Sequence, residues 1–157
     1  MNFFNWVYFV MFFIGIFLVL LFILLHQKNR RRLFDNPPVT KPYSISFLVP
    51  AYNEEDSLEQ TVKALYEIEY PKDKKEIIII NDGSKDGTAK IARKLCKNYL
   101  GVRLLDKKNS GKADSLNQAI KMAKGELIAV VDADSYPKSD ALLKMAGHFD
   151  DKNVGAV

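Results

Sequence analysis

The amino-acid sequence predicts an α/β protein whose mostly parallel sheet is flanked by helices and preceded by one transmembrane helix. Three observations support this prediction. The chain of 157 residues begins with an uncharged apolar segment at residues 3–25. From residue 44 onward, short apolar segments alternate with segments whose apolar residues recur at helical spacing, as in repeated β-α units. Polar clusters follow the apolar segments, and ligands of such sheets bind at the carboxyl ends of the strands.

The first apolar segment is long enough to cross a membrane. It runs for 23 residues, from Phe3 to Leu25. As a helix it would cover roughly the 30 Å hydrocarbon core of a bilayer. A cleaved signal peptide is the alternative, but no basic segment precedes the apolar one and no small-x-small cleavage site follows Leu25. We therefore predict a transmembrane anchor over residues 1–26.

A basic cluster directly follows the anchor and predicts its orientation. It consists of Lys28, Arg30, Arg31 and Arg32, whereas the short N-terminal flank carries no side-chain charge. By the positive-inside rule, the chain beyond residue 26 faces the cytoplasm, at the cell membrane. The single cysteine, Cys96, cannot form an internal disulfide, which fits that reducing compartment.

The net charge of +4 comes entirely from this basic cluster. The sequence holds 23 Lys and Arg against 19 Asp and Glu, so removing the four cluster residues leaves 19 of each sign. A protein that binds a phosphate backbone needs a patterned basic face. The anionic headgroups of a lipid bilayer explain a basic cluster beside a membrane span. The sequence therefore predicts the bilayer as a partner and no nucleic acid.

A proline-rich linker precedes the first β-α unit. Residues 27–43 are predicted to form a basic juxtamembrane segment and this linker, and residues 44–50 the first strand. The segment from Asn53 predicts a helix, since Leu58, Val62 and Leu65 recur at helical spacing and acidic residues occupy its first turn. Residues 76–82 predict the second strand, whose four consecutive isoleucines are typical of burial on both faces.

The rest of the chain repeats this alternation. Residues 102–105 predict the third strand, residues 126–131 the fourth, and residues 154–157 the beginning of a fifth. A helix over residues 139–149 follows the fourth strand. The helices after the second and third strands are indicated by apolar residues at helical spacing: Ala89, Ala92, Leu95 and Tyr99 in one, and Ala113, Leu116, Ile120 and Ala123 in the other.

Two aspartates follow the fourth predicted strand. Strand side chains alternate with period two, so Asp132 and Asp134 would project to one side while Ala133 points away. Adjacent carboxylates repel each other, but a divalent cation, Mg²⁺ or Mn²⁺, between carboxylate and phosphate oxygens makes the pair favourable. Two solvated loop aspartates or a helix cap are the alternative, because D-x-D is common. The position of the pair after a buried strand favours the metal.

Two other polar loops resemble known ligand loops and depart from them. Residues 81–88, "NDGSKDGT", begin like a calcium loop, but its twelfth position is Arg93, where a bidentate Glu is required. The two glycines of this loop are also ordinary turn residues, so a purely structural role stays open. The "GKA" at residues 111–113 is not a P-loop, because Asp106 stands five positions before Gly111 where glycine is needed. Lys112 remains a candidate point charge for a phosphate.

Four segments, in this order and spacing, resemble the nucleotide-sugar half of family 2 glycosyltransferases, which have the GT-A fold: "SFLVPAYNEE", "EIIIINDGSKDGT", "GKADSLNQAI" and "AKGELIAVVDADS". The resemblance covers about residues 44–157. An N-terminal span before the domain is similar to the processive membrane synthases of that family, which make hyaluronan, chitin, cellulose or poly-N-acetylglucosamine. The resemblance implies a nucleotide-sugar donor, expected to be a UDP-sugar, and a polysaccharide or lipid acceptor.

The resemblance also implies which residues bind the nucleoside. Ala51, Tyr52 and Glu54 would line the nucleoside pocket. Asp82 would accept a hydrogen bond from the uracil. Lys112 would lie near the base and the diphosphate.

The remaining implied contacts are made by the D-x-D pair. Asp132 would meet the ribose or the sugar, and Asp134 would hold a divalent cation, Mg²⁺ or Mn²⁺, on the diphosphate. The implied reaction is an inverting displacement at the anomeric carbon, in which the cation and Lys112 stabilise the departing diphosphate.

The sequence departs from the family in one respect. Members carry an acidic general base downstream of the D-x-D pair, and processive members add Q-x-x-R-W and further membrane helices. We expect none of these here and place the base beyond Val157, so we interpret the chain as the N-terminal part of a longer enzyme or as a truncated product. The alternatives are a catalytically inactive nucleotide-sugar-binding membrane fragment and a GDP-sugar polyprenyl-phosphate transferase. A haloacid-type phosphatase is disfavoured, because its nucleophile ends the first strand.

Overall fold

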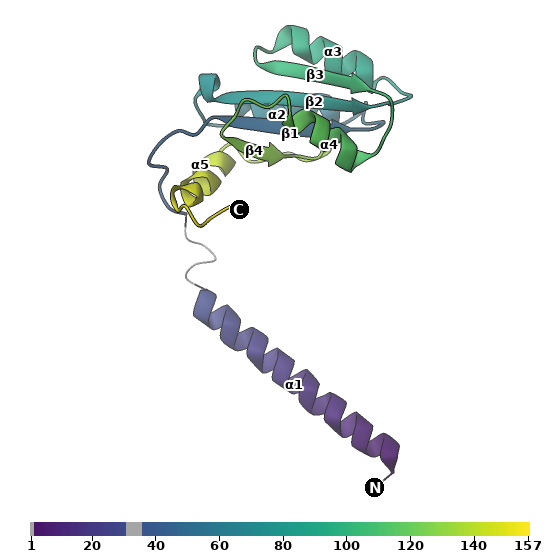
Figure 1. Cartoon of the computed structure of the whole chain (residues 1–157), viewed down its shortest axis with the longest axis vertical. Coiled ribbons are helices and arrows are strands. Elements are labelled where there is room, and N and C mark those ends of the chain that lie inside the picture. The colour runs from purple at the N-terminus through teal and green to yellow at the C-terminus, as the bar shows by residue number, and fades with distance from the viewer. Residues whose placement is uncertain (1, 31–35) are drawn as a thin grey trace. The chain divides into compact units, whose positions relative to one another are not determined.

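The structure is a computed structural model that describes residues 2–30 and 36–157 (Figure 1). It contains two compact units, Met1–Asn36 and Pro37–Val157. Arg31 and Arg32 of the predicted basic cluster, and residues 33–35 of the predicted linker, lie outside the described residues.

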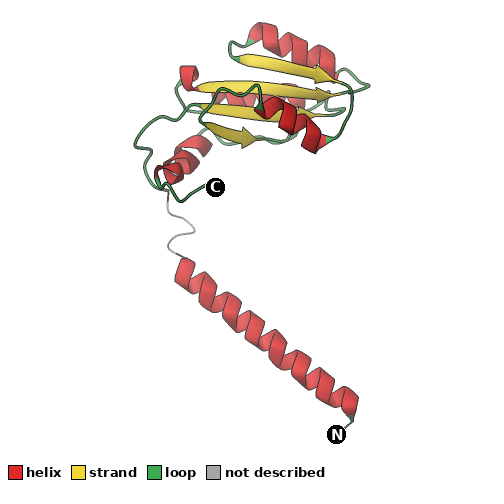
Figure 2. Ribbon diagram, in the orientation of Figure 1, coloured by secondary structure: helices red, strands yellow, loops and turns green. Residues whose placement is uncertain are grey.

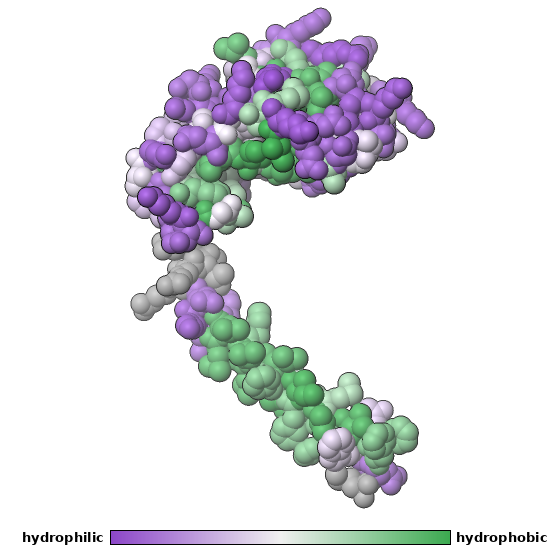
Figure 3. Space-filling model, in the orientation of Figure 1, coloured by the Kyte–Doolittle hydropathy of each residue, from purple (hydrophilic) through white to green (hydrophobic). Residues whose placement is uncertain are grey.

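The first unit consists of helix α1, Phe3–Asn29. Its side chains are apolar along most of its length, as Figure 3 shows, and none of its residues is buried in the structure. By length and composition α1 could cross a membrane, a test that an N-terminal signal sequence also passes. The predicted apolar helix is therefore present.

The second unit is built on four parallel strands in the order β3-β2-β1-β4 (Figure 2). The strands are β1 (Ile45–Ala51), β2 (Lys75–Asp82), β3 (Val102–Lys107) and β4 (Leu127–Val130). Because the strands are parallel, their carboxyl ends lie along one edge of the sheet. The predicted α/β class with a parallel sheet is confirmed.

Helices cover both faces of the sheet. Helices α2 (Leu58–Glu67) and α3 (Thr88–Asn98) pack on one face together with Phe47 and Ile79. Helix α4 (Lys112–Ile120) packs on the other face, against Leu48 and Ile78 (Figure 1). The four isoleucines of β2 alternate between these two cores and are all buried. The predicted burial of this strand on both faces is confirmed.

Helix α2 begins later than predicted, at Leu58 instead of Asn53. The acidic residues expected in its first turn lie in the preceding loop. Backbone N–H groups of that loop donate to side chains after β2: Glu54 N to Thr88 Oγ1 (2.8 Å) and Glu55 N to Asp86 Oδ2 (3.2 Å). These hydrogen bonds hold the loop against α3, so the loop does not join the helix.

The buried face of α4 also differs from the predicted one. Ser115 and Ala119 are buried, whereas Ala113 and Ile120 are exposed. The hydroxyl of Ser115 accepts a hydrogen bond from Lys107 Nζ (3.2 Å), which allows a polar side chain to face the sheet. The apolar spacing alone could not indicate this partner.

The C-terminal part has no fifth strand, and that prediction was wrong. Residues 154–157 form neither helix nor strand. Helix α5 (Ala141–Met145) and the short 3₁₀ helix η3 (Ala146–Asp150) replace the predicted helix at residues 139–149. β4 is the edge strand of the described sheet and leaves Ile128 and Val130 44% and 50% exposed, so it is not the buried strand that we predicted. Val157 lines an apolar cavity together with residues of β4 and α5 and pairs with no strand.

The last residues of the predicted linker pack against the C-terminal part of the same unit. The hydroxyl of Tyr43 donates to Asp150 Oδ1 (2.7 Å), and Thr40 N donates to Asp150 Oδ2 (3.1 Å). A Cβ added at Gly147 would lie 2.0 Å from the carbonyl oxygen of Pro37. We refer to residues 37–43 as the strap, because they cross η3 in close contact.

Candidate functional site

A cavity of about 420 Å³ lies at the carboxyl edge of the sheet. It is bounded by the ends of β1 and β2, by the beginning of α4 and by the loop after β4. Its lining contains all seven residues that the sequence predicted for ligand binding: Ala51, Tyr52, Glu54, Asp82, Lys112, Asp132 and Asp134. Pro50, Asn109, Gly111 and Ala133 complete it.

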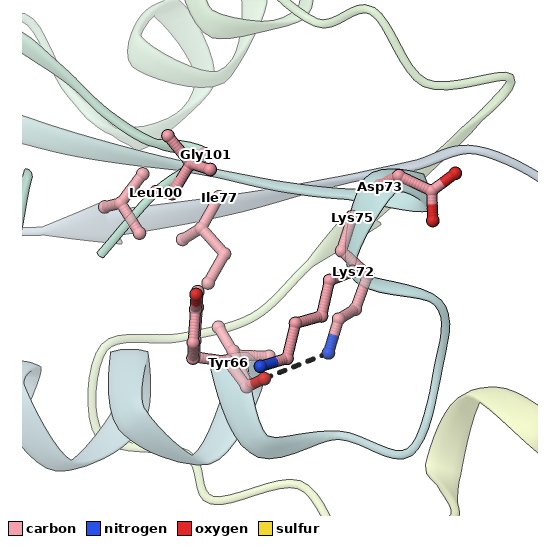
Figure 4. A pocket seen from close by; sticks show the side chains of 9 residues that line it. Tyr66, Lys72, Asp73, Lys75, Ile77, Leu100 and Gly101 are labelled. Atoms are coloured by element: carbon pink, nitrogen blue, oxygen red, sulfur yellow. Dashed lines mark hydrogen bonds between the residues drawn. The ribbon is translucent and has the colours of Figure 1, made fainter.

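A second cavity, of about 460 Å³, lies at the amino ends of β2 and β3 (Figure 4). Tyr66, Lys72 and Lys75 line it together with aliphatic side chains, and none of the predicted site residues does. Lys75 Nζ donates to the carbonyl oxygens of Tyr66 (3.0 Å) and Ile68 (2.7 Å), so this ammonium caps the C-terminal end of α2. The candidate site is therefore the cavity at the carboxyl edge.

Tyr52 and Glu54 are positioned by contacts between the loops after β1 and β2. Between them, Asn53 has a positive φ of 57°, a conformation that asparagine adopts more readily than most residues. Its backbone N–H donates to Ser84 Oγ (3.0 Å), and its side chain accepts from Lys85 N (2.9 Å). This arrangement leaves Tyr52 46% exposed at the cavity.

Asp86 has a structural role in the loop after β2. Its carboxylate accepts from Thr88 N (3.0 Å) at the beginning of α3 and from Glu55 N (3.2 Å). Burial acts to raise the pKa of Asp86, but the hydrogen bonds from the hydroxyl of Thr88 (2.6 Å) and from these backbone N–H groups outweigh it, so the pKa lies below its ordinary value. The structural interpretation of "NDGSKDGT" thus holds for its second half, while its first aspartate lines the cavity.

Asp82 is the buried carboxylate of the cavity, with only 6% of its surface exposed. Its Oδ1 accepts from Lys107 Nζ (2.7 Å) and Ser110 N (2.9 Å), and its Oδ2 accepts from Gly111 N (2.9 Å). Burial acts to raise the pKa of Asp82, but the hydrogen bonds from Lys107 and Ser110 outweigh it, so the pKa is lowered. The carboxylate is therefore ionised at neutral pH and held in one orientation.

Lys107 was not identified from the sequence. It is the last residue of β3 and stands opposite Asp82 in the strand register. Its ammonium also contacts the hydroxyls of Ser110 and Ser115. The predicted third strand ended at residue 105, so pairing its end with that of the second strand would have placed Leu105 beside Asp82. The two further residues of β3 in the structure bring Lys107 to this position.

Asp132 and Asp134 reach the same cavity from a turn. β4 ends at Val130, and Ser135 N donates to the carbonyl oxygen of Asp132 (3.0 Å), so the pair does not continue a strand as predicted. Ala133 between them is buried, and its carbonyl oxygen accepts from Thr61 Oγ1 (2.7 Å). This bond to α2 fixes the turn and leaves both carboxylates exposed at the cavity.

The carboxylates of this turn suit a divalent cation only with further ligands. Their oxygens are the donors that Mg²⁺ and Mn²⁺ prefer. Asp132 Oδ1 pairs with Lys112 Nζ at 2.5 Å, whereas Asp134 forms no ion pair within residues 2–30 and 36–157. Within the same residues no group of three or more His, Cys, Asp or Glu side chains is placed to enclose a metal. The donor set therefore fits a cation whose remaining ligands come from phosphate.

Comparisons of the sequence with known proteins give one family model and several curated relatives. The sequence model of Glycosyl transferase family 2 matches residues 46–157. The probable glycosyltransferase YdaM of Bacillus subtilis (strain 168) is 36% identical over 118 residues, covering 72% of this chain and 28% of that protein. The poly-beta-1,6-N-acetyl-D-glucosamine synthase of Staphylococcus aureus (strain MSSA476) is 35% identical over 162 residues, covering 100% of this chain and 39% of that protein. The chain thus spans well under half the length of these curated relatives.

Solved structures resemble this chain over much of its length. The mannosyltransferase PcManGT from Pyrobaculum calidifontis, in complex with GDP-Man and Mn²⁺, matches with a TM-score of 0.75 and 31% identity, covering 85% of this chain and 41% of that one. The S. aureus TarS 1–349 structure in complex with UDP-GlcNAc matches with a TM-score of 0.62 and 32% identity, covering 69% of this chain and 31% of that one. These similarities confirm the predicted GT-A fold.

Proposed function

Because the chain belongs to glycosyl transferase family 2, we propose that its carboxyl-edge cavity binds a nucleotide-sugar, expected to be a UDP-sugar, together with Mg²⁺ or Mn²⁺. The intact enzyme would transfer the sugar, with inversion, to a polysaccharide or lipid acceptor. The convergence of seven predicted ligand-binding residues on one cavity carries this proposal. The GDP-Man and Mn²⁺ in PcManGT and the UDP-GlcNAc in TarS support the ligand class.

The nucleoside would occupy the end of the cavity between β1 and β2. Ala51 ends β1 with a small side chain, which leaves room for a base beside the backbone. The exposed ring of Tyr52 offers a stacking surface, and the carboxylate of Glu54 lies close by in the cavity lining. Asp82 Oδ2 accepts a hydrogen bond from Gly111 N in the cavity lining, and a carboxylate oxygen can accept a second one. We assign that second bond to an N–H of the base.

The diphosphate and sugar would lie between α4 and the D-x-D turn. On ligand binding, the exposed ammonium of Lys112 would exchange its partner Asp132 for a phosphate. Asp132 would then be free to accept hydrogen bonds from ribose or sugar hydroxyls, while Asp134 would hold the cation. A bound divalent cation stabilises the negative charge of a departing diphosphate.

The general base is proposed to come from outside this cavity lining. Two acidic residues that follow Asp134 are engaged elsewhere: Asp140 pairs with Lys144 (2.5 Å), and Asp150 binds the strap residues Tyr43 and Thr40. We therefore propose that the cavity binds the donor and that neither of these two residues is the general base. A catalytically inactive nucleotide-sugar-binding protein is the second candidate function, and the same observation favours it.

The proposal includes a membrane anchor. Helix α1 is long and apolar enough to span a bilayer, and Lys28 and Arg30 follow near its end. We propose that α1 spans the cell membrane and that the second unit faces the cytoplasm.

Titration calorimetry on the full chain in detergent tests the donor site. We expect UDP and its sugar conjugates to bind more tightly than CDP, ADP and free uridine, and Mn²⁺ to strengthen the binding of every diphosphate. A GDP-sugar that binds better than every UDP-sugar would select the alternative donor. If no nucleoside diphosphate binds with or without Mn²⁺, the proposed donor site is wrong.

A further inference from the structure

Lys107 is a buried ammonium just outside the carboxyl-edge cavity. Its side chain is only 10% exposed. Its Nζ donates to Asp82 Oδ1 (2.7 Å) and Ser115 Oγ (3.2 Å), contacts the hydroxyl of Ser110, and lies 3.5 Å from Asp114 Oδ2. Burying an ammonium is costly unless it is paired and hydrogen-bonded. The ion pair with Asp82 and the hydrogen bonds to the serine hydroxyls therefore offset the cost of burying the Lys107 ammonium.

The two carboxylate oxygens of Asp82 have different hydrogen-bond partners, and only those of Oδ2 line the cavity. Oδ1 is bonded to Lys107 and to the backbone of Ser110, neither of which lines the cavity. Oδ2 is bonded to the backbone of Gly111, which does line it. We therefore infer that Lys107 holds Oδ1 on the side away from the cavity, so that Oδ2 is the oxygen nearer to the cavity.

We propose that Lys107 is a positioning residue that sets base specificity by holding Asp82 as a charged acceptor toward the nucleobase. This inference rests on the proposed donor site. A charged acceptor favours a base edge with an N–H, as in uracil or guanine. It disfavours cytosine, whose ring nitrogen at the same edge is itself an acceptor, so two acceptors would face each other. Lys107 would therefore contribute to selection between UDP and CDP without touching either.

The same contacts extend this role to the beginning of α4. Lys107 reaches Ser110 and Ser115, and Asp82 accepts from the backbone of Ser110 and Gly111. These residues flank Lys112, which lines the cavity and whose ammonium pairs with Asp132. The Lys107–Asp82 pair thus joins the base-binding carboxylate to the segment that carries the phosphate-binding lysine.

The test is the ratio of CDP to UDP dissociation constants, measured with Mn²⁺ on the full chain in detergent. A hydrogen bond to a charged group contributes about 1.5–3 kcal/mol, so we expect the wild type to prefer UDP by roughly 10-fold to 100-fold. Lys107→Met should reduce this ratio to within about threefold of unity, while Lys107→Arg, which keeps the charge, should retain most of it. Lys108→Met is the matched control, because Lys108 is the exposed neighbour, and it should leave the ratio unchanged.

A double-mutant cycle separates positioning from a general loss of structure. Asp82→Asn should lose the UDP preference, since its amide can donate to cytosine. Adding Lys107→Met to Asp82→Asn should then change the ratio no further. Thermal unfolding followed by circular dichroism checks that each variant folds. If Lys107→Met unfolds, Lys107→Gln, which keeps a donor and removes the charge, is measured by the same criteria.

The outcomes distinguish this inference from the proposed function. If Asp82→Asn loses the UDP preference but the folded Lys107 variants keep the wild-type ratio, the positioning role is overturned and the donor site stands. The positioning role would also be overturned if Lys107→Met changed the ratio of CDP to UDP dissociation constants as much in the Asp82→Asn background as in the wild type. If the wild type binds neither nucleotide, or Asp82→Asn behaves like the wild type, the proposed donor site fails first.

Discussion

At the scale of single residues, Lys112 and Asp132 form an ion pair at the cavity. The two groups are 2.5 Å apart and both are exposed, so their attraction is weak and readily exchanged. A phosphate and a cation would compete for them. Asp134 has no such pair among the described residues, which supports its proposed role as the metal ligand.

The first prediction concerns the division of roles within this turn. Asp134→Asn keeps the side-chain shape but removes the charge, so it should abolish the strengthening of UDP binding by Mn²⁺. Asp132→Asn should weaken binding of the UDP-sugar more than it weakens the effect of Mn²⁺. Calorimetric titration of UDP and a UDP-sugar, with and without Mn²⁺, measures both effects. Equal behaviour of the two variants, or metal-independent binding by the wild type, would contradict these roles.

A second prediction concerns the pH dependence of stability. The pKa of Asp82 is lowered, despite its burial, by hydrogen bonds from Lys107 and Ser110. Its stabilising contribution is therefore present above the unfolded pKa of about 3.9 and is lost as the pH falls through the lower folded pKa. The free energy of unfolding should fall less between pH 5 and pH 3 in Asp82→Asn than in the wild type. Denaturant unfolding at several pH values measures this difference, and parallel curves would contradict it.

At the scale of elements, close backbone packing joins the strap to η3. A Cβ at Gly147 would lie 2.0 Å from the carbonyl oxygen of Pro37, and this neighbour is backbone, not the end of a flexible side chain. The strap is further held by Asp150, whose pKa is lowered by its hydrogen bonds from Tyr43 and Thr40. A substitution at this glycine must therefore displace the strap.

The third prediction follows from this packing. Gly147→Ala should lower the free energy of unfolding by about 1–3 kcal/mol, the usual cost of overpacking. Gly155→Ala is the matched control, because a Cβ there meets nothing within 4 Å. Chemical denaturation of both variants provides the measurement. Equal free energies of unfolding for Gly147→Ala and the wild type would show that the strap can shift without loss of stability.

At the scale of the whole molecule, the chain combines an apolar helix with a charge-balanced α/β unit. The fourth prediction is that it is an integral membrane protein. Extraction of membranes with alkaline carbonate should leave the chain in the pellet, because α1 would bury its apolar side chains in the bilayer core. A variant without residues 2–25 is the control and should move to the supernatant. Recovery of the full chain in the supernatant would contradict the anchor.

The burial of the core strand β2 could be predicted because its signal lies in one contiguous segment of the sequence. The run Ile77 to Ile80 predicted a doubly buried strand, and all four side chains are buried. The seven residues predicted to bind ligand lie together for a related reason: they end or follow predicted strands or begin a helix, and parallel strands bring their carboxyl ends to one edge. Both inferences needed only the period of the side chains and the direction of the strands.

The sequence by itself thus determined the β-α alternation, the apolar helix α1 and the set of residues at the carboxyl edge, because composition and periodicity are properties of contiguous segments. Only the tertiary structure decided that β4 lies at the edge of the described sheet, that α2 begins at Leu58, and that no strand forms at residues 154–157. It alone also placed Lys107 against Asp82. Each of these features depends on hydrogen-bond partners from segments far apart along the chain, and no local pattern identifies such partners.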